Sequence, residues 1–228
     1  LCKRQLIQSN PVRLVDMPKI KEKAIIQLDP DEVASLLDYI ENYGNQLTGV
    51  KLYHYNKQKY RDIAIVTLLL GTGVRVSELV GLNISDIDFK NNGIRILRKG
   101  GNEMIVYFGE EVEKALKDYL EISRNAITPL SGHEDALFLS GQRKRISVDA
   151  VEKMVKKYAS AVSAKTITPH KLRSTYGTAL YRETGDIYLV ADVLGHADVN
   201  TTKKHYAKLS DARRRSASKA VVLREKTN

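Results

Sequence analysis

Apolar and polar residues alternate at helical spacing soon after the start of the chain. Asp29, Pro30 and Glu32 form a sequence that is typical of a helix N-terminus with a capping box. The helix predicted behind them has one apolar face, made of Val33, Leu36, Leu37 and Ile40. The next stretch, 42–58, is polar and rich in tyrosine, and it predicts a loop.

A strongly apolar segment follows this polar stretch. Residues 63–70 are nearly all apolar and long enough to predict a buried helix. The break Gly71-Thr72-Gly73 is expected to end that helix, because glycine is the residue that most readily leaves helical geometry. A second short helix is predicted to begin near Val76.

The middle of the chain predicts a small antiparallel sheet. Residues 87–89 form a short β-rich run, residues 94–97 alternate in polarity, and residues 104–108 form a third run. Two turn signals separate these runs, Asn91-Asn92-Gly93 and Gly100-Gly101-Asn102.

Helical patterns resume after the predicted sheet. Ser147 and Thr168 are suitable capping residues, and Pro169 fits the first turn of a helix. The predicted helices span 110–122, about 147–162, 169–183, 186–194, 199–208 and 211–225. We therefore expect a mainly α protein with one small antiparallel β-sheet, an α+β fold.

The length of 228 residues suits one domain with a short appendage. Residues 1–21 predict an interdomain linker remnant, because two Xaa-Pro steps interrupt any regular structure there. Residues 22–228 are expected to form the domain, with a C-terminal helix or tail at about 209–228. The chain starts at leucine rather than methionine, so we expect a fragment or a processed product.

The composition is that of an ordinary globular protein, with 43% hydrophobic and 28% charged residues. No apolar run approaches the roughly 18 residues of a membrane span, and the first 20 residues carry no signal-peptide pattern. Cys2 is the only cysteine, which excludes an internal disulfide and a cysteine-based metal site. These features favour a reducing cytoplasmic location.

The net charge of +10 changes the picture, because lysine and arginine can replace the counterions of a polyanion. Between Lys203 and Asn228 the chain has nine basic residues against two acidic ones. Most of the excess positive charge therefore lies at the C-terminal end. The same balance is also compatible with a solvated basic surface or a disordered tail.

Six polar residues stand in local sequences that could bind and attack one phosphate: Arg75, Lys99, His170, Arg173, His196 and Tyr206. Arg75 follows the Gly-Thr-Gly break, where a guanidinium can project into a cleft and match two phosphate oxygens. An ion pair with Glu78 is the alternative, and Glu78 can also orient Arg75. Lys99 precedes two glycines at a predicted hairpin tip, or it is one more surface lysine.

His170 and Arg173 are three residues apart in the first turn of a capped helix, where the helix dipole favours an anion. They are otherwise ordinary surface residues. His196 follows Gly195 and fits a helix C-terminal cap equally well. Tyr206 is one of 12 tyrosines, most of which are expected to be packing residues.

Taken together, the six residues suit phosphoryl transfer without a metal. Guanidinium and imidazole groups can neutralise the charge that develops on the non-bridging oxygens of a phosphodiester. A phenol with a pKa of about 10 needs a base or a positive field to act as nucleophile, and the departing sugar oxygen needs an acid such as lysine. A Walker A loop, clustered metal-binding carboxylates and a His-Glu-Xaa-Xaa-His motif are absent from the sequence. We therefore expect no cofactor and no metal.

These motifs resemble those of the tyrosine recombinases, the phage integrase and Xer family. The resemblance covers nearly the whole chain and is carried by residues 69–79, by Thr168-Pro169-His170-Lys171-Leu172-Arg173 and by Leu194-Gly195-His196. It implies the catalytic-domain fold of that family, without the N-terminal core-binding domain. It also implies that Arg75, Arg173, His170 and His196 bind the scissile phosphate, that Lys99 protonates the 5′-hydroxyl, and that Tyr206 forms a 3′-phosphotyrosyl link.

The same resemblance implies double-stranded DNA as partner and a homotetramer on paired DNA sites, with a monomer when free. The cytoplasmic, nucleoid-associated location and a chromosomal, phage or transposon role follow from it as expectations. Four further basic residues are predicted to contact DNA: Lys171, Lys203, Lys204 and Arg145. The hydrophobic residues 221–223 are a predicted docking patch for a neighbouring subunit.

One feature departs from the family pattern. The step from His196 to Tyr206 is ten residues, whereas nine is common in the family, and position 205 is a histidine. No other tyrosine follows Tyr188, so Tyr206 is the only candidate nucleophile near the end of the chain. Two alternatives stay open at this point, a type IB topoisomerase and a DNA-binding relic that has lost catalysis.

Overall fold

The structure is a computed structural model that describes residues 26–98, 101–196 and 199. Several predictions lie outside these residues: Lys99, Lys203, Lys204, Tyr206, the linker at 1–21, the docking patch at 221–223, the helix at 211–225 and nearly all of that at 199–208.

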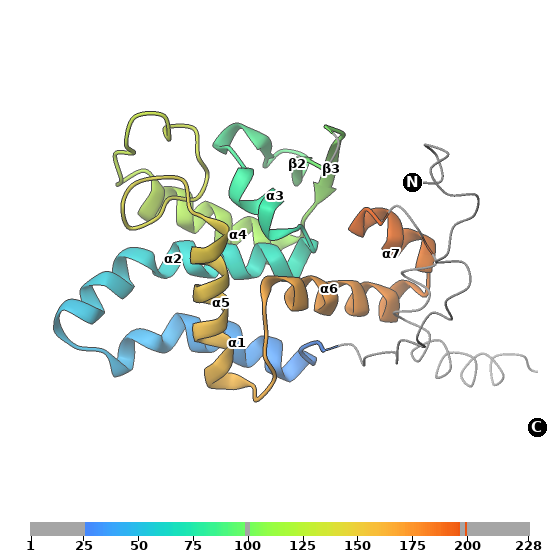
Figure 1. Ribbon diagram of the computed structural model, residues 1–228, viewed down its shortest axis with the longest axis horizontal. Helices are drawn as coiled ribbons and strands as arrows, with labels where there is room; N and C mark the ends of the chain where they lie inside the picture. The colour runs from blue at the N-terminus through green and yellow to red at the C-terminus, as the bar shows by residue number, and fades with distance from the viewer. Residues whose placement is uncertain (1–25, 99–100, 197–198, 200–228) are drawn as a thin grey trace, which may run out of the picture.

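The described part of the chain is mainly helical and has one small sheet, as the sequence predicted (Figure 1). The helices are α1 Pro30–Asn42, α2 Gly49–Thr72, α3 Val76–Gly81, α4 Glu110–Asp118, α5 Val148–Val162, α6 Pro169–Thr184 and α7 Ile187–Leu194. The strands are β1 Ile87–Asp88, β2 Gly93–Leu97 and β3 Glu103–Tyr107. Among the described residues, no helix has the length and apolar character that a membrane span requires.

Helix α1 begins with the predicted capping box. The Asp29 carboxylate accepts a hydrogen bond from the Glu32 N–H, and the Glu32 carboxylate accepts one from the Asp29 N–H, both at 2.9 Å. Two of the four predicted apolar positions, Leu36 and Ile40, are fully buried. The cap thus fixes the start of a helix whose apolar face packs on the core.

The loop predicted over 42–58 is wrong for most of that stretch, because α2 already begins at Gly49. Two of the three tyrosines there, Tyr43 and Tyr55, are packing residues, whereas Tyr53 is exposed. The Tyr55 ring is buried and its hydroxyl lies 2.9 Å from the Ile40 oxygen, while its ring meets that of Tyr43 edge-on. Burial of these rings stabilises a helix whose other face is polar, which hides the helical signal in the sequence.

The buried helix predicted at 63–70 is the second half of α2, and it forms the centre of the core. Helices α1, α4, α5 and α6 all pack against α2. The helix ends at Gly73, whose φ of 65° is left-handed and whose N–H donates to the Leu69 oxygen at 3.1 Å. A side chain at Gly73 would meet the Tyr176 ring at 2.4 Å, so this turn lies directly against α6.

The three strands form one antiparallel sheet in the order β1-β2-β3. Ile94 pairs with Val106 and Ile96 with Met104, and Ile94, Ile96 and Val106 are buried. The predicted turn at 91–93 connects the first two strands. The β2–β3 hairpin projects from the core on the side of the molecule where α7 lies (Figure 1).

Helix α4 confirms the helix predicted at 110–122, but its last part widens into a π-helical turn at Tyr119–Arg124. The Tyr119 hydroxyl donates to the Leu137 oxygen at 3.0 Å and accepts from the Leu139 N–H at 3.3 Å. The wide turn is therefore tied to the segment that precedes α5.

Helices α6 and α7 bring the end of the described chain back to the turn between α2 and α3. Gly185 ends α6 in a left-handed conformation, and the Asp186 carboxylate then caps α7 by accepting from the Tyr188 and Leu189 N–H groups. Tyr181, Val190 and Leu194 form a small apolar cluster between the two helices. Helix α7 is thereby held with its C-terminus directed at the turn between α2 and α3.

Candidate active site

Arg75 stands at the N-cap position of α3, directly after the glycine turn that ends α2. Its Nη1 donates to Glu78 Oε1 at 2.8 Å, and its main-chain N–H donates to Glu78 Oε2 at 2.7 Å. Its Nη2 donates to the main-chain oxygen of Gly195 at 3.0 Å. The Glu78 side chain is buried, whereas 39% of the Arg75 side chain is exposed. Glu78 therefore orients the guanidinium from its buried side.

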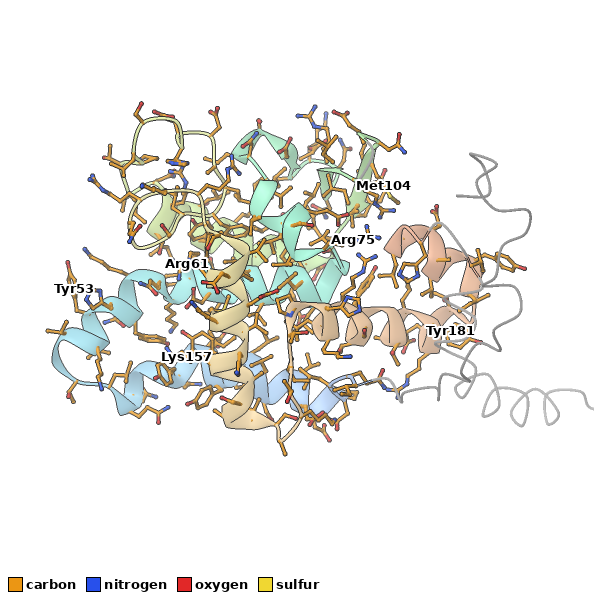
Figure 2. All side chains as sticks on the ribbon, in the orientation of Figure 1. Tyr53, Arg61, Arg75, Met104, Lys157 and Tyr181 are labelled. Atoms are coloured by element: carbon orange, nitrogen blue, oxygen red, sulfur yellow. The ribbon has the colours of Figure 1, made fainter. Side chains whose placement is uncertain are left out.

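Arg173 approaches the same place from α6 and is buried. Its Nη1 donates to the main-chain oxygen of Gly73, and its Nη2 donates to that of Leu194. Arg75 and Arg173 therefore both connect the α2–α3 turn with the end of α7, although they are far apart in the sequence. Their side chains converge on the end of α7, as the predicted phosphate site requires. Figure 2 labels Arg75, which lies between α3 and α7.

A third arginine, Arg98, reaches the same helix end from the base of the β2–β3 hairpin. Its Nη2 donates to the Val193 oxygen at 2.8 Å, and its Nη1 makes a longer contact of 3.4 Å with the Asp192 oxygen. The four successive carbonyls of residues 192–195 are thus met by Arg98, Arg173 and Arg75. The Asp192 oxygen also accepts from the Gly195 N–H at 2.8 Å. All four carbonyls lie at the C-terminal end of α7, where the helix dipole is negative, so cations stabilise them.

Sequence reasoning missed Arg98, although the residue lies directly before the predicted Lys99. The pKa of Arg98 is lowered chiefly because burial removes water from its guanidinium, while Glu78 raises it and Arg75 lowers it. Arg98 therefore belongs to the same electrostatic neighbourhood as the Arg75–Glu78 pair. No short sequence pattern announces this, because the contact with residues 192–193 spans more than 90 positions.

The two predicted histidines lie at helix ends in the same part of the fold. His170 is exposed in the first turn of α6, one helical turn before Arg173. His196 is half-buried and directly follows Gly195, and its N–H donates to the Ala191 oxygen at 2.9 Å. Gly195 is left-handed with a φ of 60°, so the helix-cap interpretation of this sequence is confirmed, and it places His196 beside the arginines.

The other predicted residues are distributed as follows. Lys171 is half-buried in the first turn of α6, between His170 and Arg173. Arg145 donates to the main-chain oxygens of Val80 and Leu82 at 3.1 and 2.7 Å and to Asn83 Oδ1 at 2.5 Å. Through these bonds Arg145 holds the residues that end and follow α3. Its contact with DNA stays a prediction.

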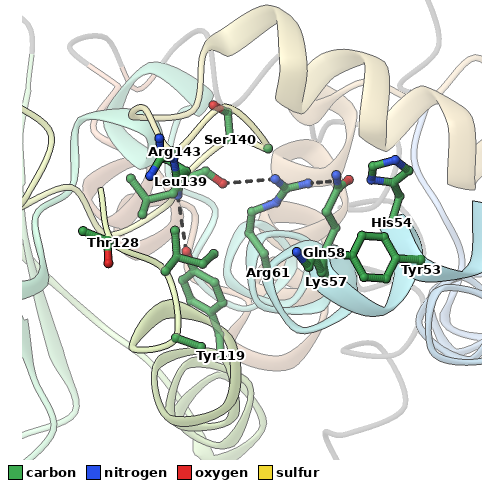
Figure 3. A pocket seen from close by; sticks show the side chains of 13 residues that line it. Tyr53, His54, Lys57, Gln58, Arg61, Tyr119, Thr128, Leu139, Ser140 and Arg143 are labelled. Atoms are coloured by element: carbon green, nitrogen blue, oxygen red, sulfur yellow. Dashed lines mark hydrogen bonds between the residues drawn. The ribbon is translucent and has the colours of Figure 1, made fainter. Parts of the chain in front are cut away.

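A separate pocket of about 420 Å³ lies beside the N-terminal half of α2 (Figure 3). None of the four predicted catalytic residues that the structure describes lines it. Arg61, which faces it, is committed to internal contacts, because it donates to the Leu139 oxygen at 3.0 Å and to Asp62 at 2.6 Å. Asp62 in turn accepts from the Tyr158 hydroxyl at 3.0 Å. Arg61 therefore belongs to a buried hydrogen-bond network that links α2 with α5 and with Leu139.

A sequence model of the phage integrase family matches residues 27–213 of the chain. The chain belongs to the phage integrase family. This match covers the whole described site, from the α1 cap to His196, and the fold is that of the tyrosine recombinase catalytic domain, as expected.

Two curated relatives of the chain are named tyrosine recombinases. The tyrosine recombinase XerS of Streptococcus agalactiae is 37% identical over 204 residues, which are 88% of this chain and 56% of the relative. The tyrosine recombinase XerC of Roseiflexus castenholzii is 32% identical over 201 residues, 88% of this chain and 60% of the relative. The chain therefore spans less than two thirds of the length of these proteins.

Among solved structures, the crystal structure of XerA recombinase is 33% identical with a TM-score of 0.66, over 80% of this chain and 60% of that one. The phage integrase family domain in this chain thus has the same arrangement of helices and sheet as an Xer recombinase. Arg75, Arg98 and Arg173 lie within residues 27–213, the part that the family model matches.

Proposed function

We propose that this chain is the catalytic part of a site-specific DNA recombinase or integrase, which cleaves and rejoins DNA strands through a 3′-phosphotyrosyl intermediate. The observation that carries the proposal is the convergence of Arg75 and Arg173 on the end of α7, next to His196. Two guanidinium groups beside an imidazole form the cationic setting that a phosphodiester under attack requires.

The Arg75 side chain is oriented and still accessible. An arginine has five N–H donors, and the bonds to Glu78 and Gly195 use one on each terminal nitrogen. Because 39% of this side chain is exposed, a phosphate can approach its outer edge. Arg173 is buried and supports the floor of the same region. His170 and His196 are proposed to complete the contacts with the non-bridging oxygens.

The proposed cleavage step transfers a phosphoryl group from a sugar oxygen to a phenol. The Tyr206 oxygen attacks phosphorus after its proton leaves to a base or to water, and a P–O bond to tyrosine forms. The bond between phosphorus and the 5′ oxygen breaks, and its electron pair stays on that oxygen. Lys99 donates a proton to this oxygen, which departs as a 5′-hydroxyl. Religation is the reverse, so the bond energy is retained in the phosphotyrosine.

Double-stranded DNA is the proposed partner. The net charge of +10 and the basic C-terminal stretch support it, since both favour a polyanion. A solved relative has DNA in it: the Tn1549 transposon integrase with transposon right end DNA is 26% identical with a TM-score of 0.68, over 96% of this chain and 74% of that one. We further propose a monomer when free, a tetramer on paired DNA sites, and association with the nucleoid.

The test is covalent capture on a nicked duplex that releases a short fragment after cleavage. We expect a denaturant-resistant protein–DNA adduct from the purified chain, and its loss in Tyr206→Phe. The matched control is Tyr107→Phe, at a strand position that is 66% exposed, which should cleave normally. An adduct that survives Tyr206→Phe would remove the nucleophile assignment, and no adduct from the unmodified chain would contradict the proposed activity.

A second measurement separates recombination from simple relaxation. A recombinase exchanges strands between two DNA sites, whereas a topoisomerase only nicks and closes one duplex. We expect recombinant products and a particle with four protein chains when two target sites are present. Relaxation of supercoiled DNA without exchange would favour the topoisomerase alternative.

A further inference from the structure

Arg98 connects the β2–β3 hairpin with the C-terminus of α7, two parts of the site that are far apart in the sequence. It directly follows β2, at the base of the hairpin that carries Lys99, and it binds the oxygens of Asp192 and Val193 near the C-terminus of α7. His196 lies three residues beyond Val193. One side chain therefore spans the distance between the hairpin and the helix end.

The fit between Arg98 and the helix end is close. A Cβ atom on Gly195 would lie 1.6 Å from Arg98 Nη1 and 2.2 Å from its Cζ, so any side chain at position 195 would displace the guanidinium. The Arg98 Nε is buried and has no hydrogen-bond partner within the described structure. The guanidinium thus packs directly on the main chain of Gly195, and this van der Waals contact holds it in addition to its hydrogen bonds.

A lysine could not replace this arrangement fully. The guanidinium lies against Gly195, and its two terminal nitrogens donate to two successive carbonyls, whereas an ammonium has all its donors on one nitrogen. Arg98 is also the last described residue before Lys99, and consecutive Cα atoms are about 3.8 Å apart. A fixed Arg98 therefore fixes where the main chain of Lys99 begins.

We infer that Arg98 is a positioning residue for leaving-group protonation: it anchors the base of the β2–β3 hairpin to the α7 end, so that Lys99 is delivered to the departing 5′ oxygen. This inference rests on the proposed function and adds to it. Arg98 neither receives nor donates the transferred proton. Its loss should slow the protonation step and leave phosphate binding by Arg75 and Arg173 in place.

The test replaces the bridging 5′ oxygen of the scissile phosphate with sulfur. Cleavage then breaks a P–S bond and releases a thiolate, which needs no acid because the pKa of a thiol is only about 8.5. We expect Arg98→Ala to cleave the oxygen substrate about 100-fold more slowly than the unmodified chain. On the sulfur substrate we expect its rate to return to within about threefold of the unmodified chain, as Lys99→Ala should also do.

Three variants make the result specific. Arg98→Lys should give an intermediate loss on the oxygen substrate, since it keeps the positive charge but has all its donors on one nitrogen. Arg173→Ala should stay slow on both substrates, because it affects phosphate binding. Arg95→Ala is the matched control: Arg95 lies on β2, three residues before Arg98, is exposed and pairs with Asp86 at 2.8 Å, so it should leave both rates unchanged.

The outcomes separate this inference from the proposed function. If the unmodified chain forms adducts and Arg98→Ala is equally slow on both substrates, or normal on both, the positioning role is wrong and the recombinase proposal stands. A variant that has lost its fold would also be slow on both, and circular dichroism would show it; Arg98→Lys then decides, because sulfur must rescue it too. If the unmodified chain cleaves neither substrate, both proposals fail.

Discussion

The Arg75 guanidinium donates a hydrogen bond of 3.0 Å to the main-chain oxygen of Gly195, a residue 120 positions later in the chain. Glu78 holds the other side of the same guanidinium at 2.8 Å. The position of His196 is therefore linked to the glycine turn that ends α2. A change on either side of this contact should affect the other, because the two segments share one arginine.

Substitution of Glu78 by glutamine should slow cleavage without loss of the fold. The carboxylate now accepts from both the Arg75 N–H and the guanidinium, and a glutamine has only one oxygen to offer. We expect the single-turnover rate of adduct formation to fall about tenfold, which equals about 1.4 kcal/mol in activation free energy. Glu113→Gln, in an exposed pair with Lys117, is the control and should cleave normally. An unchanged rate in Glu78→Gln would show that Arg75 needs no orienting carboxylate.

Gly195→Ala should destabilise the protein more than glycine replacement at a comparable turn. An alanine there has an unfavourable φ of 60°, which costs about 1 kcal/mol, and its Cβ would also displace Arg98. Gly132→Ala is the matched control, because it has a φ of 82° but open space around the new methyl group. We expect the free energy of unfolding from urea titration to fall by about 1 kcal/mol for Gly132→Ala and by at least twice that for Gly195→Ala. Equal losses would show that Arg98 moves aside freely.

Much of the fold can be predicted from the sequence because capping residues, glycine breaks and strand patterns act locally. The Asp29 cap, the glycine break at 71–73, the hairpin strands and the Ser147 cap are signals of a few residues each, and the structure confirms all of them. The loop prediction for 42–58 is wrong because Tyr55 of α2 packs on Tyr43 and donates to the Ile40 oxygen of α1, while Tyr43 packs on Tyr158 of α5. Those contacts belong to the tertiary structure, and a polar local sequence carries no sign of them.

The residues of the candidate site also differ in whether a local sequence signal or only a tertiary contact identifies them. Arg75, His170, Arg173 and His196 are recognisable in the sequence because each lies beside a glycine turn or a helix terminus. The structure shows Arg75 and Arg173 in contact with the end of α7, directly before His196. Arg98 did not stand out, since its role depends on carbonyls nearly a hundred residues away. The roles given to Lys99 and Tyr206 stay predictions, and both residues lie outside the described part of the chain.

Tyr119→Phe should test the π-helical turn after α4. Removal of the hydroxyl leaves the Leu137 oxygen and the Leu139 N–H without that partner in a buried site. We expect a loss of about 1–3 kcal/mol in the free energy of unfolding, measured by urea titration. Tyr53→Phe, at a position that is 55% exposed, should change it by less than about 0.5 kcal/mol. A loss as small as that of the control would mean that water replaces the missing hydroxyl.

Acid should weaken the contact between α1 and the α5–α6 connection through Glu32. The pKa of Glu32 is lowered to about 2, chiefly by the hydrogen bond from Lys165 at 2.5 Å and then by the N–H of Asp29, with Ser163 adding to the effect. A carboxylate whose pKa is lower in the folded state stabilises that state at any pH above its unfolded value of about 4.3. This contribution is lost as the pH falls from there to about 2.

Glu32→Gln removes the titrating group, so the variant should be less stable than the unmodified chain at neutral pH. The difference in the free energy of unfolding between the two should shrink as the pH falls from about 5 to about 2, because protonation then removes the same interaction from the unmodified chain. Lys165→Met should produce a similar loss at neutral pH, since it removes the largest cause of the shift. The double variant should lose less than the sum of the two single losses, because the two side chains share one bond. Urea titrations at several pH values measure all four proteins, and a difference that stays constant with pH would exclude Glu32 as the titrating contact.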